Sequence, residues 1–444
     1  MKTYIHLFTF LLITIIPFCG QSQYPNTRKE GVDTLATINS FYEIGDFYCM
    51  DYSGDYSEIL DWLDDQLSKK TLEQFDPFEC SLFSANGDAG NQLLGRNFDN
   101  SDNDVLLTRY SPPDANASMA FTRMTDLGFA VGTNYDLLTF NQKLPLLFAA
   151  YFVPDGINEQ GLSAGLASVD PVTYTVDPTK DTIFITRLIR EILDHANTVD
   201  EALEIANSYN VFDNNVHTIS HHLLVGTPTG ESIVLEFNNG EFQAIYSETD
   251  WQVLTNIPVY NVPLEQLMNS CWRYSILYTT LEEHSGIVSW QQGMDALEQV
   301  HINCPWSAIY DMTNRGIYFA VHNNYENIAY VDLENFNFVI YIAIPELSPG
   351  LLKGILSCNY PNPFRDFTTI KYTIREKKPV ELTIYDVLGK KVKTLIDKEV
   401  QPGEYSVTWD RLNEQGEKVL PGMYICRILY NGKSTSIRMI VTGN

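Results

Sequence analysis

Residues 79–99 have the sequence ECSLFSANGDAGNQLLGRNFD, which predicts a strand, a Gly-rich turn and a second strand. Arg96 follows Cys80 by 16 residues, and Asp99 follows it by 19. In a tight hairpin, that spacing returns a guanidinium group and a carboxylate to the side of the thiol. This makes Cys80 a candidate nucleophile. Our hypothesis, which the spacing alone does not establish, is that Cys80 becomes a new N-terminus by self-cleavage after Glu79 and serves as the nucleophile of an amidase.

The composition limits the size and the partners of the protein. A chain of 444 residues is long enough for two or three domains, and a hydrophobic content of 44% is normal for a globular protein. The net charge of −27 argues against nucleic-acid binding, which needs a basic surface. Residues 359–444 hold 14 Lys and Arg against 10 Asp and Glu, whereas the preceding residues hold 15 against 46. This shift in charge indicates a separate C-terminal module.

The N-terminal residues 1–22 have the pattern of a secretory signal peptide. Lys2 supplies the positive charge, and the apolar run 7–18 is too short to span a bilayer comfortably. Small residues precede Gln23, where cleavage is expected. Cys19 raises lipidation as an alternative, although the large residue before it does not fit a usual lipobox.

The cysteines and histidines predict neither a disulfide nor a metal site. Six cysteines remain after removal of the signal, and none of them forms a CxxC pair. A secreted chain could pair some of them, but if Cys80 is catalytic, at least one of the other five stays free, so the disulfide pairing is left open. His217 and His221 are four residues apart, but no third ligand is evident, and we predict no metal and no cofactor.

The order of the expected elements predicts five segments. After the signal, residues 23–79 form an acidic prosegment with a helix near 56–74. This segment either covers the site until Cys80 is released or is an ordinary N-terminal helix. Residues 80–345 form the catalytic domain, 346–358 form a linker, and 359–444 form a small Ig-like β-sandwich with five or six short strands.

Within residues 80–345, strands are followed by helices and then by strands again, which predicts an α+β fold with mostly antiparallel sheets. The expected elements are strands within 105–131, helices within 181–209, a strand meander over 219–246, a helix over 268–281 and strands within 308–344. Asp155 and Gly156 predict a turn, with Asn158 at the mouth of the next strand. Asn256 ends a strand, and Arg273 lies near the start of a helix, where an arginine is ordinarily solvated.

Several short motifs between residues 80 and 345 resemble the choloylglycine hydrolase group of N-terminal-nucleophile amidases. This group includes bile-salt hydrolases and penicillin V acylases, with acid ceramidase-like amidases as wider relatives. The matching features, in the family's order, are Cys80, GRNFD at 95–99, DGINEQGL at 155–162, VLTNIP at 253–258, the pair Arg273-Tyr274 and the strands AIYDMTNRGIYF. The resemblance implies the four-layer αββα sandwich of that superfamily.

The same resemblance implies a role for each site residue. Arg96 would lie beside the thiol and favour the thiolate, and Asp99 would orient the new α-amine. Asn256 and Asn158 would form the oxyanion hole, and Arg273 would anchor the network of asparagine and cysteine. In the simplest members of the family the cysteine follows the initiator Met, whereas here 79 residues precede it and Glu79 carries a charge at the scissile bond.

The C-terminal residues 359–444 resemble the sorting domain of the type IX secretion system. The match comprises NYPNPF, IYDVLGKKV, PGEYSVTWD and the terminal strand RMIV. It implies export through the periplasm and outer membrane of a Gram-negative bacterium, with the secretion machinery as partner. The alternative is an Ig-like binding module.

Together, these features predict a secreted, self-processing amidase that cleaves the N-acyl amide bond of a small molecule. Two alternatives stay open. One is an acyltransferase of the acyl-CoA:6-aminopenicillanic acid acyltransferase type, and the other is a surface binding protein that is never processed. The sequence leaves the acyl group and any homo-oligomer undetermined.

Overall fold

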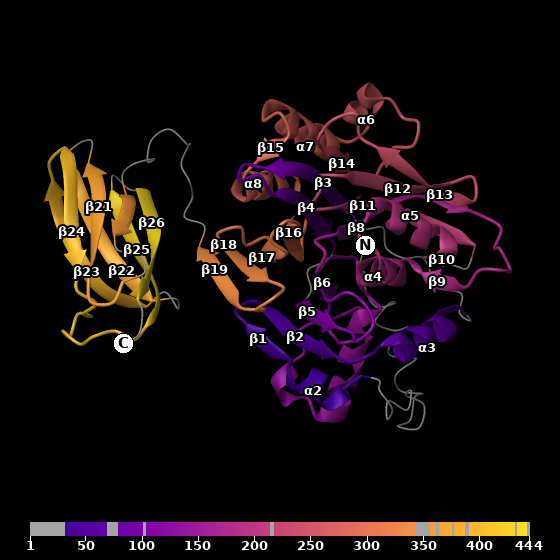
Figure 1. The fold of residues 1–444 in the computed structure, drawn as a ribbon, viewed down its shortest axis with the longest axis horizontal. Helices are drawn as coiled ribbons and strands as arrows, with labels where there is room; N and C mark the ends of the chain where they lie inside the picture. Colours follow the sequence, from indigo (N-terminus) through magenta and orange to yellow (C-terminus); the bar gives the residue numbers. More distant parts are fainter. Residues whose placement is uncertain are drawn as a thin grey trace. The chain divides into compact units, whose positions relative to one another are not determined.

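The computed structural model describes residues 32–68, 79–100, 104–213, 217–342, 356–360, 364–374, 377–386, 390–430 and 433–441. The chain divides into two compact units, residues 1–339 and 340–444, shown in Figure 1. The predicted signal peptide lies outside the described residues, as does most of the predicted linker. Among the described helices, none combines the length and apolar character needed to cross a membrane.

Two large sheets form the centre of the first unit. The first has nine strands, in the order β1 (Tyr42–Ile44), β2 (Phe47–Ser53), β5 (Val105–Ser111), β6 (Ser118–Arg123), β7 (Asp155–Asn158), β8 (Ser163–Thr173), β11 (Thr218–Gly226), β12 (Ser232–Asn238) and β13 (Glu241–Tyr246). The second has the order β14 (Gln252–Leu254), β3 (Glu79–Gly87), β4 (Gln92–Asp99), β16 (Trp306–Asp311), β17 (Gly316–Val321), β18 (Asn327–Asp332) and β19 (Phe338–Ile342), and β15 (Ile287–Val288) pairs with β3. Contacts of β3 with β8 and β11 join the two sheets.

Helices cover the outer faces of both sheets. On the nine-stranded sheet lie α4 (Ile185–His195) and α5 (Val199–Ser208), and on the eight-stranded sheet lie α7 (Trp272–Glu283) and α8 (Trp290–Val300). The remaining elements are α2 (Thr34–Asn39), α3 (Ser57–Ser68), η1 (Tyr135–Leu137), η2 (Phe140–Ala150), α6 (Leu264–Ser270) and the parallel pair β9 (Thr182–Phe184) and β10 (Asn210–Phe212). The order helix, sheet, sheet, helix confirms the predicted α+β fold of αββα type.

The apolar patterns explain how these layers pack. In α4 the residues Ile185, Leu188, Ile189 and Ile192 recur at helical spacing, and all are fully buried against the sheet. In β3 both faces are buried over residues 80–85, because one face packs on the other sheet and the other face packs on α7 and α8. The inner position of β3 thus removes Cys80 from solvent.

Two local predictions are wrong. The expected strand near residues 128–132 is a series of turns, in which Gly128 adopts a φ of 91° and its N–H bonds back to Thr125. The expected turn at Asp155 and Gly156 is instead the start of β7, which pairs with β6 and β8. A β7 this short gives little sequence signal, because the contacts that stabilise it come from residues distant in the chain.

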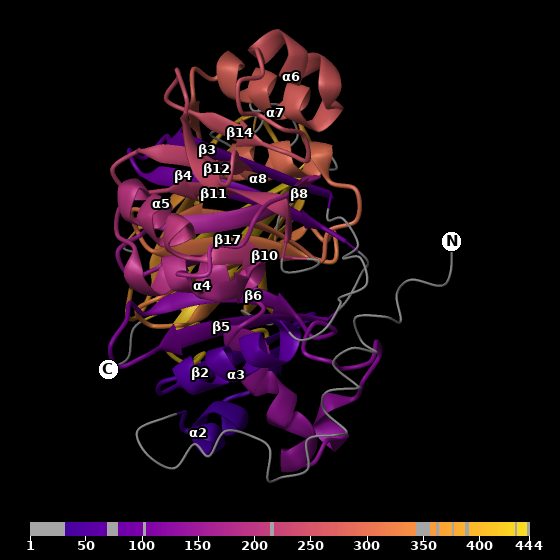
Figure 2. The same ribbon diagram turned by 90° about the vertical axis from the view of Figure 1, so that its right-hand side faces the viewer.

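The described part of the predicted prosegment is built into the first unit. β2 pairs in parallel with β5, from Tyr48 beside Leu106 to Ser53 beside Ser111. Figure 2 shows α2 and α3 at the end of this unit opposite to α6 and α7. The segment before Cys80 therefore extends the nine-stranded sheet.

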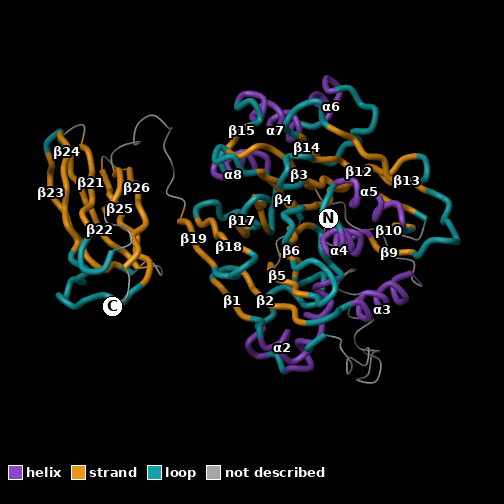
Figure 3. Tube along the Cα trace, in the orientation of Figure 1, coloured by secondary structure: helices purple, strands orange, loops and turns teal. Residues whose placement is uncertain are grey.

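The second unit contains two sheets, with seven strands where the sequence predicts five or six. One sheet has β20 (Leu356–Tyr360), β21 (Thr368–Ile374) and β24 (Gly403–Trp409), and the other has β23 (Lys391–Val400), β22 (Lys378–Asp386), β25 (Gly422–Tyr430) and β26 (Lys433–Val441). Side chains from both sheets, including Ile370, Leu382 and Trp409, form one apolar core. Its described residues contain strands and loops and no helix (Figure 3), so this unit is a β-sandwich.

Candidate active site

Cys80 is the second residue of β3, and its side chain is fully buried. β3 and β4 form the predicted hairpin, in which Cys80 lies opposite Phe98. Strand side chains alternate, so Arg96 projects from the same face as Phe98, and Arg96 Nη2 donates to Cys80 Sγ at 3.7 Å. Burial raises the pKa of the Cys80 thiol, and the positive charge of Arg96 opposes that rise.

Arg96 connects the two sheets through a buried ion pair. Its Nε pairs with Asp155 in β7, and its Nη1 donates to the backbone oxygen of Leu166 in β8. Asp155 also accepts hydrogen bonds from the Trp306 indole at 3.1 Å and from the Tyr310 hydroxyl. Burial raises the pKa of Asp155, and Arg96 opposes this effect. For Arg96, burial lowers the pKa, but the charge of Asp155 and the neighbouring thiol and hydroxyl groups together raise it, so a fixed positive charge stays beside the thiol.

Asn256 and Arg273 hold the backbone of Cys80 from its other side. The Cys80 N–H donates to Asn256 Oδ1 at 2.7 Å, and Arg273 Nη2 donates to the same oxygen at 2.9 Å. Arg273 Nη1 donates to the Cys80 carbonyl at 2.8 Å. The Asn256 amide group donates to the Ser168 carbonyl at 2.8 Å. Arg273 is thus buried at the site, although its place in a helix alone predicts solvation.

Asp99 lies opposite Glu79 in the pairing of β3 with β4, at the bond that would be cut. Its Oδ1 accepts hydrogen bonds from the Ile302 N–H at 2.9 Å, the Asn303 N–H at 3.2 Å and the Cys304 thiol at 2.6 Å. Its Oδ2 is buried without a hydrogen-bond partner among the described residues, and Arg273 Nη1 lies 3.9 Å away. Burial raises the pKa of Asp99, and the thiol of Cys304 is the largest opposing influence.

Asn158 is the predicted site residue that the structure assigns elsewhere. Its amide group donates to the carbonyls of Leu193 and Ala196 at the end of α4, at 3.0 and 2.8 Å. Its Oδ1 accepts from the N–H groups of Gln160 and Leu162, and its own N–H donates to the Leu162 carbonyl. Because these contacts use both amide hydrogens and the backbone N–H, Asn158 has no donor left for an oxyanion. In the uncut chain Asn158 is thus a brace between β7 and α4, and its role in the oxyanion hole stays a prediction.

The structure also adds residues that the sequence did not single out. The sequence pattern assigns Asp155 to a turn, although this residue lies in the DGINEQGL motif. Ser168 and Cys304 reach the site only through the packing of β8 and β16 beside β3 and β4. The sequence signal for Asp155 is its place in a motif shared with the family, which could have indicated a role at the site.

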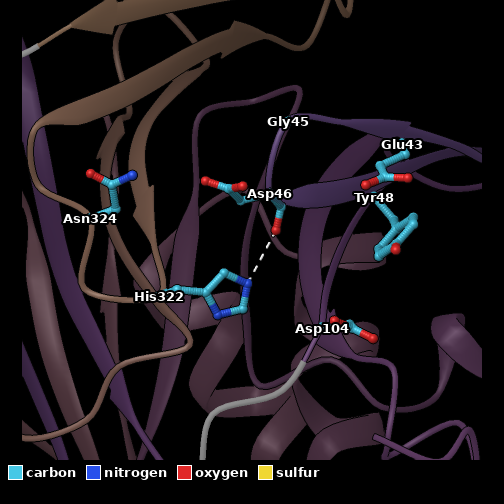
Figure 4. Close-up of a pocket in the computed structure, with 7 residues that line it drawn as sticks. All are labelled: Glu43, Gly45, Asp46, Tyr48, Asp104, His322 and Asn324. Carbon is cyan, nitrogen blue, oxygen red and sulfur yellow. Dashed lines mark hydrogen bonds between the residues drawn. The ribbon is translucent and has the colours of Figure 1, made fainter. Parts of the chain in front are cut away.

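The described cavity lies away from Cys80. It has a volume of about 440 Å³ and contains none of the predicted site residues. Figure 4 shows its lining, with His322 Nε2 3.1 Å from the Asp46 carbonyl oxygen. The lining residues are Glu43, Gly45, Asp46, Tyr48, Asp104, His322 and Asn324. Its lining includes no cysteine, and the buried Cys80 is closed to solvent in this uncut form of the chain.

Comparison with known proteins gives two family matches. Residues 80–299 match the linear amide C–N hydrolases of the choloylglycine hydrolase family, and residues 359–442 match the secretion system C-terminal sorting domain. No curated protein matches the chain in a sequence comparison.

Two solved structures are similar to the first part of the chain. A mutant conjugated bile acid hydrolase from Clostridium perfringens has 14% identity and a TM-score of 0.42, with 59% of this chain and 96% of that chain covered. Penicillin V acylase from Agrobacterium tumefaciens has 16% identity and a TM-score of 0.41, with 59% and 90% covered.

The resemblance inferred from the short motifs is thus confirmed for both parts of the chain. The sorting domain marks the protein for export by the type IX system to the cell surface or the medium. Residues 80–299 match the choloylglycine hydrolase family, and the protein is an enzyme that hydrolyses linear amide C–N bonds.

Proposed function

We propose that the protein is a self-processing cysteine amidase that acts outside the cytoplasm on the N-acyl amide of a small molecule. The observation that carries this proposal is the arrangement around the backbone nitrogen of Cys80. Asn256 Oδ1 accepts this N–H at 2.7 Å. Asp99 lies opposite Glu79 in the strand pairing, and its Oδ2 has no hydrogen-bond partner among the described residues. Cleavage would turn this amide N–H into an α-amine with additional hydrogens. The Asp99 carboxylate could accept a hydrogen bond from that amine.

The self-cleavage step needs no group beyond those at the site and one water. The Cys80 sulfur attacks the Glu79 carbonyl carbon, the C–N bond breaks, and the departing nitrogen takes the thiol proton. Water then hydrolyses the thioester, which leaves a carboxylate on Glu79 and a free thiol and α-amine on Cys80. Arg273 Nη2 lies 3.8 Å from the side-chain carboxylate of Glu79. The positive charge of Arg273 would also favour the main-chain carboxylate that cleavage leaves on this residue.

Amide hydrolysis would repeat this chemistry on the substrate. The thiolate, favoured by Arg96, attacks the acyl carbon, and the α-amine passes a proton to the leaving amine. An α-amine has an ordinary pKa near ~8, so it can exchange protons at neutral pH. The amide group of Asn256 is the candidate donor to the oxyanion, and water releases the acid from the thioester.

We propose further that the segment before Cys80 stays bound after cleavage. Met50, Tyr52 and Leu63 are buried in the core shared with the rest of the first unit. The Tyr56 hydroxyl donates to Asp194 in α4 at 2.7 Å. Release of this segment would expose one edge of the nine-stranded sheet and much of its core.

Intact-mass analysis of the purified protein tests the processing. We expect a chain that begins at Cys80, together with a second mass for the preceding segment that co-elutes under native conditions and separates in denaturant. The Cys80→Ala variant should remain one chain. Equal cleavage of wild type and variant would show that another protease cuts the bond.

A panel of acyl amides tests the substrate class. Penicillin V, glycine- and taurine-conjugated bile salts and N-acyl homoserine lactones differ in their acyl and amine parts, and mass spectrometry detects the acid released from each. Turnover of one of them by the mature protein supports the amidase. Acylation of an added amine without release of acid would favour the acyltransferase.

A further inference from the structure

Two adjacent histidines on β11, His221 and His222, are each paired with a buried carboxylate. Their side chains leave opposite faces of the strand, with His221 opposite Ser168 and His222 opposite Ala167 in β8. Both are buried, with exposed fractions of 2% and 0%. Neither is explained by the chemistry at Cys80.

His222 fixes the main chain next to Asn256. Its Nε2 lies 2.7 Å from the Thr255 carbonyl oxygen, and its Nδ1 lies 3.0 Å from Glu236 Oε2 in β12. Glu236 accepts two more hydrogen bonds, from the N–H groups of Val259 at 2.9 Å and Tyr260 at 3.1 Å. The pair of His222 and Glu236 therefore holds the chain on both sides of Asn256.

The partners of His222 also define where one of its protons lies. A backbone carbonyl can only accept, so Nε2 must carry a hydrogen. Its Nδ1 faces the Glu236 carboxyl, whose pKa burial raises but its hydrogen bonds with His222, Val259 and Tyr260 together lower.

His221 acts on the side chain of Asn256 through Ser168. Its Nδ1 lies 2.8 Å from Asp213 Oδ2, and its Nε2 lies 3.2 Å from the Ser168 hydroxyl. The carbonyl of the same Ser168 accepts the amide group of Asn256 at 2.8 Å. His221 and Asp213 thereby fix the residue that determines which way the carboxamide of Asn256 points.

We propose that His222 with Glu236, and His221 with Asp213, are positioning residues that hold Asn256 in its working orientation beside Cys80. If the carboxamide turned over, its NH₂ group would face the N–H of Cys80 and the guanidinium of Arg273, which are both donors. The two carboxylate–histidine pairs prevent this by fixing Thr255 on one side and Ser168 on the other. This inference rests on the proposed role of Asn256 at Cys80.

A double-mutant cycle between His222 and Asn256 tests the proposal. In the full chain, His222→Gln should lower the rate of self-cleavage and kcat on the order of 100-fold, the cost of a displaced catalytic group. KM should change by less than about threefold, because the substitution displaces a group that acts in the transition state. In an Asn256→Ala background the same substitution should have almost no further effect. A full, independent loss in that background would overturn the proposal.

His322→Gln is the matched control, because His322 also contacts a backbone carbonyl but lies at the cavity of Figure 4. It should leave self-cleavage and kcat unchanged. If His222→Gln does not fold, NMR of ¹⁵N-histidine-labelled, uncut Cys80→Ala protein gives an independent answer. We expect a slowly exchanging Nε2–H signal for His222, because Nε2 donates to the buried Thr255 carbonyl, and the absence of this signal would overturn the proposal.

The cycle also separates this inference from the proposed function. If Cys80→Ala still cleaves itself, the proposed function fails. If cleavage requires Cys80 but His222 and Asn256 act independently, only the positioning role fails.

Discussion

The two units of the chain differ in the kind of side chain that they bury. In the described part of the second unit, the buried polar or charged residues are Thr368, Thr383 and Arg411, and the core is otherwise apolar. The first unit buries whole ion pairs, including Arg96 with Asp155 and Arg190 with Asp194. Burial of a charge costs free energy unless a partner compensates for it. The contrast indicates that the first unit depends on the pairing of its buried charges, one pair of which lies beside Cys80, whereas the second depends mainly on apolar packing.

The largest effect should come from Cys80→Ala. Removal of a nucleophile has lowered the rate of another hydrolase by on the order of 10⁶-fold, so both self-cleavage and amide hydrolysis should become undetectable. The counterpart in the second unit is Cys426→Ala, which removes an equally buried thiol from an apolar core. Assays of cleavage and turnover should show no change for Cys426→Ala. Loss of activity in this variant would contradict the assignment of the chemistry to the first unit.

Breaking the buried ion pair should be the largest effect on stability. Asp155→Asn, made in the uncut Cys80→Ala chain, leaves Arg96 charged and unpaired in the core, at a cost of about 3–5 kcal/mol. Denaturant unfolding should show this as a lower midpoint for the first unit alone. Trp409→Ala should destabilise the second unit by a similar ~3–5 kcal/mol, through the cavity it leaves. An unchanged midpoint for Asp155→Asn would show that the pair is not buried as described.

The two asparagines should separate catalysis from folding. Asn256→Ala should lower kcat by about 100- to 1,000-fold, the usual cost of one lost oxyanion donor. Asn158→Ala should instead lower the free energy of unfolding by ~1–3 kcal/mol, because it removes the hydrogen bonds that the amide group donates to the buried carbonyls of Leu193 and Ala196. A large fall in kcat for Asn158→Ala in a protein of normal stability would restore its predicted catalytic role.

The smallest effect should be a pH dependence that arises in the segment before Cys80. Burial raises the pKa of Asp64 from 3.8 to about 6, and the pairing with Arg187 opposes that rise. The folded chain thus binds this proton more tightly than the unfolded chain, so the contribution of Asp64 to stability is full below about pH 4 and is lost as the pH rises through 6. Asp64→Asn cannot titrate. Its free energy of unfolding relative to wild type should therefore increase by about 3 kcal/mol at most between pH 4 and 7.

Chemical denaturation of both proteins at several pH values measures this difference. If the difference is the same at every pH, Asp64 does not titrate in the folded chain as described. The second unit should unfold with the same midpoint in both proteins.

The sequence by itself determined the elements that depend on residues close together in the chain. The hairpin of Cys80, Arg96 and Asp99 followed from strand and turn residues, and α4 followed from its apolar spacing. The composition and short motifs of residues 359–444 were enough to identify the sorting domain. Each of these signals is carried by neighbours in the chain, so no knowledge of the packing was needed.

Only the tertiary structure decided which side chains meet at Cys80. The sequence placed Asn256 and Arg273 in the site by resemblance, but not their contacts, and it placed Asn158 there although its donors are used at the end of α4. It assigned Asp155 to a turn, whereas the stacking of the two sheets makes it the partner of Arg96. The physical reason is that these contacts join residues far apart in the chain, and their partners depend on strand order, register and the face that each side chain occupies.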